Sequence, residues 1–179
     1  MNPIELKNQV FLYPTDTTFG IGCDATNVET IKRIYQIKKR QDSKSLIILV
    51  DSNQRLQQIV DVPDLAWDLM DLSEKPVTII YDNPRNLPKE LIPEDNTIAI
   101  RLTKDNFCKR LISKFNAPIV STSANVSGEP TPNSFEEISP EIKNEVDYIF
   151  PESEHFVPKF IGSSIIKLSQ DGKVKVIRE

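Results

Sequence analysis

The sequence predicts an α/β domain with one twisted sheet that mixes parallel and antiparallel strands and is flanked by helices. Residues 45–50 (SLIILV) form a continuous apolar run, which is typical of a strand covered on both faces. Amphipathic helical patterns separate the strand-like segments, and the last two of these flank the turn at residues 170–172 as an antiparallel hairpin. The length of 179 residues fits a single domain, which we expect to span residues 1–179.

Strands and helices are predicted to alternate in the first half of the chain. Residues 10–13 predict a short buried strand that stops at Pro14, because proline lacks the N–H that an inner ladder needs. A turn-rich loop is expected next. Asn27 is expected to cap a helix that runs to about Lys39, because apolar residues recur there at intervals of three and four. The strand at residues 45–50 is then followed by predicted helices at residues 53–60 and 63–72.

The second half of the chain is predicted to add strands, one clear helix and a polar loop. Strands are expected at residues 76–81 and 97–102, with a loop between them because the prolines there prevent a continuous helix. A helix is expected at residues 106–115 and a short strand at 118–121, before a polar loop. The remaining predictions are a helix at residues 135–146 broken at Pro140, a strand at 148–150, and hairpin strands at 163–169 and 173–178.

Composition excludes several classes of protein. The 22 basic and 26 acidic residues give a net charge of −4, which is not the basic character of a general nucleic-acid binder. The 5 glycines are placed where they cannot form a dinucleotide-binding fingerprint or a phosphate-binding P-loop. One histidine and 2 cysteines cannot supply the four ligands of a closed zinc site. The absence of a long apolar stretch and of a signal-peptide pattern leads us to expect a cytoplasmic protein without a membrane association.

Three polar segments are candidates for chemistry. Residues 13–25 present four Thr and Asp side chains directly after a strand, residues 38–44 gather cations after a helix, and residues 118–132 are rich in hydroxyl and amide groups. In a mostly parallel sheet, the first and third segments could face one crevice. Each also has an ordinary explanation: the polar loops can satisfy their own backbone, and a basic helix end is favoured by the helix dipole. These segments alone leave both interpretations open.

Taken together, the motifs of this sequence resemble the YrdC-type threonylcarbamoyl-adenylate synthases over nearly the whole chain. The resemblance implies a nucleotidyltransferase that makes L-threonylcarbamoyl-AMP and pyrophosphate from L-threonine, bicarbonate and ATP, for the threonylcarbamoyladenosine modification of tRNA. It also implies a YrdC-like fold with an open cationic cleft, Mg²⁺ that accompanies ATP, and tRNA-modification proteins as partners. The motifs that carry it are YPTDTTFGIGCDA (13–25), Lys38 with Arg40 and Lys44, PVT (76–78), IAIR (98–101), STSANVSG (121–128), SSIIKL (163–168) and VIR (176–178).

The resemblance assigns roles to individual positions. Lys38 and Arg40 match catalytic positions, and no protein ligand for a metal is implied. Positions that bind L-threonine are matched by Thr17, Arg101, Ser123 and Ser163. Positions that bind ATP are matched by Arg40, Lys44, Thr97, Asn125, Asn133 and Arg178. Cationic side chains at these places would screen the triphosphate and stabilise the leaving pyrophosphate, so the chemistry needs no histidine or cysteine nucleophile.

Some features depart from the family pattern and keep alternatives open. Ser73–Pro76 stands where the family often has Pro-Gly-Pro, and Gly162–Ser164 stands where Pro-Ser-Thr is common. The chain could instead be a non-catalytic YrdC-fold module with weak RNA binding, or a paralogue that forms another carbamoyl-adenylate. We expect residues 129–139 to act as a lid. We expect replacement of Lys38 or Arg40 to abolish turnover. The fold should stay intact, because these residues lie at the end of a helix and not in a core.

Overall fold

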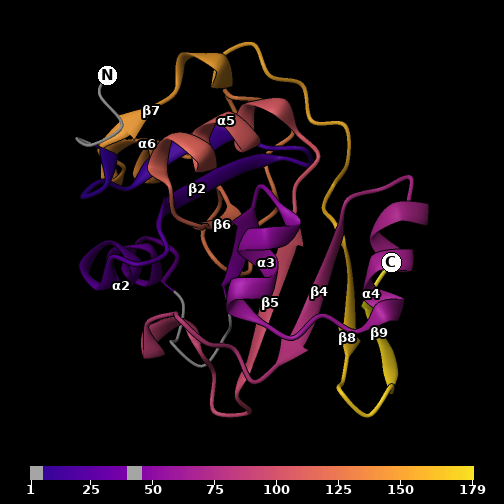
Figure 1. Cartoon of the computed structure of the whole chain (residues 1–179). Helices are drawn as coiled ribbons and strands as arrows, with labels where there is room; N and C mark the ends of the chain where they lie inside the picture. Colours follow the sequence, from indigo (N-terminus) through magenta and orange to yellow (C-terminus); the bar gives the residue numbers. More distant parts are fainter. Residues whose placement is uncertain (1–5, 40–45) are drawn as a thin grey trace.

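The computed structural model describes residues 6–39 and 46–179, in which nine strands form one twisted sheet flanked by helices (Figure 1). The strands are β1 (Phe11–Pro14), β2 (Phe19–Asp24), β3 (Ile47–Val50), β4 (Val77–Asp82), β5 (Thr97–Leu102), β6 (Ile119–Ser123), β7 (Tyr148–Ile149), β8 (Ser164–Leu168) and β9 (Val174–Arg178). The helices are α2 (Val28–Ile37), α3 (Asn53–Ile59), α4 (Asp64–Leu72), α5 (Asn106–Phe115) and α6 (Pro140–Glu145), with 3-10 turns at Lys89–Leu91 and Pro151–Ser153. None of the helices in these two ranges is both long and apolar enough to cross a membrane.

The sheet mixes the two kinds of strand pairing, as predicted. Its strand order is β7-β1-β2-β6-β3-β5-β4-β8-β9. The pairs β1 with β7, β3 with β5, and β4 with β8 are parallel, and the other pairs are antiparallel. Strands that are distant in the sequence therefore lie next to each other, and the loops after β1 and β6 can meet. The predicted α/β fold class is confirmed.

Local signals explain where the two longest helices begin. The side chain of Asn27 accepts hydrogen bonds from the backbone N–H groups of Glu29 and Thr30, which caps α2. The carboxylate of Asp105 accepts from the N–H of Cys108 at 2.8 Å and caps α5 in the same way. Both caps satisfy N–H groups that have no partner within the helix. The helices predicted at residues 27–39 and 106–115 are therefore confirmed close to their expected bounds.

Two apolar cores lie on opposite faces of the sheet. Along a strand, successive side chains point to opposite faces, and Leu12, Ile48 and Val120 pack in one core with α2, α3 and α4. Their neighbours in sequence pack with α5 in the other core, where Phe11, Leu49 and Ile119 are fully buried. Helix α5 covers only part of its face. The rest of that face is left open for the cavity described below.

A glycine in β2 permits close packing across the sheet. A Cβ atom at Gly22 would lie 2.6 Å from the carbonyl oxygen of Val120 and 2.8 Å from the Tyr13 ring. Both distances are shorter than real contacts, and the carbonyl oxygen belongs to the backbone of the adjacent strand β6, which is not free to move. Glycine is therefore required here for the ring of Tyr13 to lie across β2.

Three predictions about elements were wrong. Residues 19–24 form the central strand β2 where a turn-rich loop was expected, because burial between β1 and β6 outweighs the weak strand preference of the two glycines there. Only Pro140–Glu145 is helical in the segment predicted as a helix at 135–146, because Ser139 caps a new helix at Pro140. Strand β1 includes Pro14, because this residue pairs with Phe19 at the end of the ladder, where a missing N–H is tolerated.

Candidate functional site

A cavity of about 300 Å³ opens on the face of the sheet that α5 leaves uncovered. We call it the sheet cavity. Its floor contains Ala99 and Arg101 of β5, which lie on the same face as the α5-contacting Leu49 because Leu49 and Arg101 are paired in register. Polar groups from three separate parts of the chain surround this floor. They are Thr15, Thr17 and Thr18 after β1, Ser121, Thr122, Ser123 and Thr131 on and after β6, and Ser163 and Arg178 from the C-terminal hairpin region.

The loop between β1 and β2 is held in place by its own hydroxyl groups. Thr15 Oγ1 donates to the carbonyl oxygen of Thr18 at 2.7 Å and accepts from the backbone N–H groups of Thr17 and Thr18 at 3.1 and 3.2 Å. The hydroxyl of Thr18 donates to the carbonyl oxygen of Pro132 at 3.3 Å, which joins this loop to the polar loop after β6. Both predicted polar loops therefore line one cavity. The hydrogen bonds between side chains and backbone that are expected of an ordinary loop are also present, and they fix the conformation of the loop that lines the cavity.

Arg101 is the most notable group in the sheet cavity. Its side chain is only 5% exposed, and its Nη2 atom lies 2.9 Å from Oδ1 of Asp16 in a buried ion pair. Nη1 donates to the Thr17 hydroxyl at 3.5 Å, and Nε has no hydrogen-bond partner among the described residues. A guanidinium that lines a cavity and has few hydrogen-bond partners among the described residues is suited to bind the oxygen atoms of an anion.

Ser163 and Arg178 form the opposite wall of the sheet cavity. The hydroxyl groups of Ser163 and Thr78 lie 2.7 Å apart, and Arg178 Nε donates to the carbonyl oxygen of Ser163 at 2.9 Å. Burial and repulsion by Arg101 both lower the pKa of Arg178. Two arginines therefore line the same cavity, and the described part of its lining contains no Asp or Glu to balance them.

Lys38 lies outside the lining of the sheet cavity. It is 2% exposed, and its ammonium group donates to the carbonyl oxygens of Ser123, at 2.5 Å, and of Asn125. The Asn125 side chain donates to the carbonyl oxygens of Val126 and Glu129 at 2.9 and 2.8 Å. In this structure both side chains bind the loop after β6. A catalytic role for Lys38 and a nucleotide-binding role for Asn125 remain predictions.

The other predicted nucleotide-binding residues are scattered. Thr97 is buried at the start of β5, on the same face as Ala99 and Arg101, and donates to Asp95 at 2.7 Å. Asn133 is exposed, and its backbone N–H donates to Glu137 at 2.8 Å. Neither lines the sheet cavity, although Thr131 near Asn133 does. Arg40 and Lys44 lie outside the described residues, so the open cationic cleft stays a prediction.

Several lining residues were given no role from the sequence. Ser121 and Thr131 belong to the hydroxyl-rich segment at residues 118–132, which was the available signal for them. The apolar floor of Ile47, Ile80 and Ile165 carried no such signal. These residues lie on three different strands, and only the pairing of β3, β5, β4 and β8 brings them to one face.

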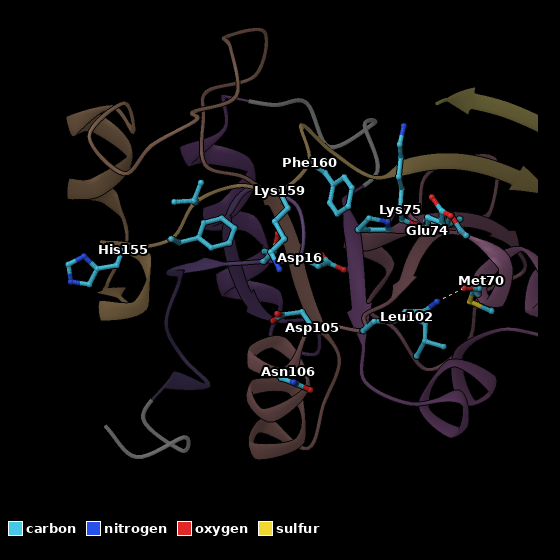
Figure 2. A pocket seen from close by; sticks show the side chains of 17 residues that line it. Asp16, Met70, Glu74, Lys75, Leu102, Asp105, Asn106, His155, Lys159 and Phe160 are labelled. Atoms are coloured by element: carbon cyan, nitrogen blue, oxygen red, sulfur yellow. Dashed lines mark hydrogen bonds between the residues drawn. The ribbon is translucent and has the colours of Figure 1, made fainter.

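A second cavity of about 660 Å³ adjoins the first and is drawn in Figure 2. We call it the side cavity. Thr15 lines both cavities, and the connection between the turn at Pro151–Ser153 and β8 contributes residues 155–157, 159 and 160 to the side cavity and 161–163 to the sheet cavity. Apolar groups such as Met70, Leu102 and Phe160 dominate its walls, together with Asp16 and three lysines. Asp16 is thus exposed to the side cavity and paired with an arginine of the sheet cavity.

The fold and the sheet cavity define an α/β protein with a cavity between hydroxyl-rich loops and two arginines, whose chemistry suits a small anionic ligand. The sequence model of the family described as Telomere recombination (Sua5/YciO/YrdC) matches residues 5–179. The chain belongs to this family.

Similar proteins and solved structures support the same grouping. The chain is 34% identical over 176 residues to the threonylcarbamoyl-AMP synthase of Pseudoalteromonas translucida (strain TAC 125), and this alignment covers 94% of the chain and 90% of the relative. The crystal structure of P. abyssi Sua5 complexed with L-threonine superimposes with a TM-score of 0.81 at 25% identity, over 93% of this chain and 49% of that one. The chain thus spans about half the length of that Sua5 protein. E. coli YciO has the same fold, with a TM-score of 0.81 at 24% identity over 98% of this chain and 86% of that one.

Proposed function

We propose that this protein is an L-threonylcarbamoyladenylate synthase, which makes threonylcarbamoyl-AMP and pyrophosphate from L-threonine, bicarbonate and ATP. The buried guanidinium of Arg101, which lines the sheet cavity together with Arg178, is the observation that carries this proposal. A carboxylate is a good ligand for such a group, because a charge-assisted hydrogen bond contributes about 1.5–3 kcal/mol. The relative named threonylcarbamoyl-AMP synthase and the Sua5 structure with L-threonine support the choice of substrate.

The hydroxyl groups of the sheet cavity suit an amino acid whose side chain is itself polar. Arg101 would bind the carboxylate of L-threonine, while Thr17, Ser123 and Ser163 would contact its amino and hydroxyl groups. The amine nitrogen joins the carbon of bicarbonate with loss of water, and an oxygen of the resulting carbamate attacks the α-phosphorus of ATP as pyrophosphate leaves. Positioning and charge stabilisation supply the catalysis in such a sequence.

The nucleotide would extend from the threonine toward the cationic residues. Arg178 faces the cavity, and Arg40 and Lys44 would hold the triphosphate with it. We propose that Mg²⁺ arrives bound to ATP. Among the described ranges, no three His, Cys, Asp or Glu side chains lie close enough together to hold a metal ion. The product would pass in the cytoplasm to the proteins that modify tRNA.

The test is the release of pyrophosphate from the purified protein with L-threonine, bicarbonate, ATP and Mg²⁺. The proposal expects release only when all substrates are present, and a threonylcarbamoyl-AMP mass that shifts when the bicarbonate is labelled with ¹³C. Equal activity with other amino acids would point to a paralogue that forms another carbamoyl-adenylate. RNA binding with steep salt dependence and no turnover would instead favour a non-catalytic RNA-binding module.

A further inference from the structure

Asp16, in the loop after β1, is the charged partner of Arg101; it lines the side cavity, and Arg101 lines the sheet cavity. Its carboxylate oxygen Oδ1 lies 2.9 Å from Arg101 Nη2, and the two side chains are 14% and 5% exposed. The contact between these two atoms is an ion pair without a hydrogen bond, and Oδ1 accepts no hydrogen bond from any described residue. Figure 2 shows Asp16 among the residues that line the side cavity.

The orientation of Arg101 depends on few contacts. An arginine side chain has several rotatable bonds, and its planar guanidinium selects ligands only when it is held in one orientation. Besides the ion pair with Asp16, this guanidinium has one long hydrogen bond of 3.5 Å, to the Thr17 hydroxyl, and its Nε has no hydrogen-bond partner in the described part of the chain. Arg178 shares the cavity and repels Arg101. Asp16 is therefore the group that can hold Arg101 in place.

Asp16 is itself anchored on two sides. Its loop is fixed by the Thr15 hydroxyl, which bonds backbone groups of the two threonines that follow Asp16. Its second oxygen, Oδ2, accepts from the Thr103 hydroxyl at 3.4 Å, and that hydroxyl also accepts from the backbone N–H of Asp105. The carboxylate thus occupies a defined place before any ligand arrives. This is the preorganisation that a binding site needs.

We infer that Asp16 is a positioning residue, which orients Arg101 so that its guanidinium group faces the carboxylate of the amino-acid substrate. This inference rests on the proposed function. Asp16 acts through Arg101 and touches no reacting atom. Its removal is expected to weaken recognition of the substrate carboxylate and to leave recognition of ATP unchanged.

The experiment compares two substrates in three variants. L-threoninamide replaces the carboxylate of L-threonine by a neutral amide and keeps the reacting amine. In Asp16→Asn we expect the KM for L-threonine to rise at least tenfold, the KM for ATP to stay unchanged, and the preference for L-threonine over L-threoninamide to fall by a similar factor. Asp16→Glu keeps the charge and should recover part of the preference. Glu74→Gln removes one negative charge from the side cavity at an exposed residue without a contact to Arg101, and should behave as the wild type.

The outcomes separate the two proposals. If the wild type releases no pyrophosphate with L-threonine, the proposed function fails and the role of Asp16 falls with it. If the wild type is active and Asp16→Asn keeps the same preference between the two substrates, the inference about Asp16 alone is overturned. A merely structural role would lower kcat/KM equally for both substrates, and this result would also overturn the inference about Asp16. Thermal unfolding checks the folding of each variant, and Asp16→Glu decides the question if Asp16→Asn does not fold.

Discussion

Replacing Lys38 by methionine is expected to lower stability as well as activity. The ammonium group of Lys38 is buried and donates to the backbone carbonyl oxygens of Ser123 and Asn125. Methionine keeps much of the apolar length and removes both donors. The sequence led us to expect that the fold would not be affected, because Lys38 follows a helix end, but the structure buries the side chain under the loop after β6.

The size of the effect follows from these contacts. A hydrogen bond to a charged donor contributes about 1.5–3 kcal/mol, and part of this is offset by removal of the ammonium group from water. For two such bonds we expect a net loss of about 2–4 kcal/mol in the free energy of unfolding. In a chain of this size, 1 kcal/mol shifts the melting temperature by about 2–4 °C. The midpoint should therefore fall by about 4–16 °C.

Lys39 provides a matched control for this measurement. It is the next residue and also a lysine, but its side chain is 61% exposed and pairs with the half-exposed Glu141. Exposed ion pairs contribute little, so Lys39→Met should unfold close to the wild type. Urea unfolding can be followed by the fluorescence of Trp67, the single tryptophan, alongside the pyrophosphate assay. If Lys38→Met unfolds at the same urea concentration as Lys39→Met, the reasoning about the buried ammonium is wrong.

Three further predictions test the packing and the charges. Gly22→Ala places a Cβ atom 2.6 Å from a backbone oxygen of β6 and should destabilise the protein by about 1–3 kcal/mol or more in urea unfolding; an unchanged midpoint would contradict the packing. Burial raises the pKa of the Cys23 thiol to about 12 and that of Cys108 well above its ordinary value, so both should react with a thiol reagent only after unfolding, and fast labelling of the native protein would refute this. Burial raises the pKa of Asp147, but the hydrogen bond from Arg33 and the other favourable contacts lower it by more, so this pKa lies below its ordinary value. Asp147→Asn should thus be less stable than the wild type at pH 7, by about 0.5–1 kcal/mol, and the difference should vanish as the pH falls through that lowered pKa.

Helices and inner strands could be predicted from the sequence because their signals are local. Asn27 and Asp105 cap helices through bonds to residues two or three positions away, and the apolar run before Asp51 needs only burial to form a strand. Strand β2 could not be predicted in this way. Its glycines have weak strand preferences, and its stability comes from pairing with β1 and with β6, which lies about a hundred residues further along the chain.

The candidate site shows the same division. Thr17, Arg101, Ser123 and Ser163 were named from motifs, and the structure brings all four to the lining of the sheet cavity. Neither the burial of Lys38 nor the pairing of Asp16 with Arg101 could be read from those motifs, because both depend on contacts between segments about 85 residues apart. Residue types indicate which groups can bind a ligand. Their orientation depends on the tertiary structure.

The sizes of the two cavities do not decide which one is the site. The side cavity has about twice the volume of the sheet cavity, but its lysines are balanced by Asp16, Glu74 and Asp105, and Lys104 already donates to the carbonyl oxygen of Met70 at 2.8 Å. The sheet cavity has two arginines, and no Asp or Glu is among its described lining residues. An anion that enters it meets two cations that no carboxylate of the lining balances, whereas the cations of the side cavity are already balanced. The smaller cavity is therefore the better anion site. Asp16 lines the side cavity and pairs with Arg101 of the sheet cavity, so this ion pair connects the two cavities.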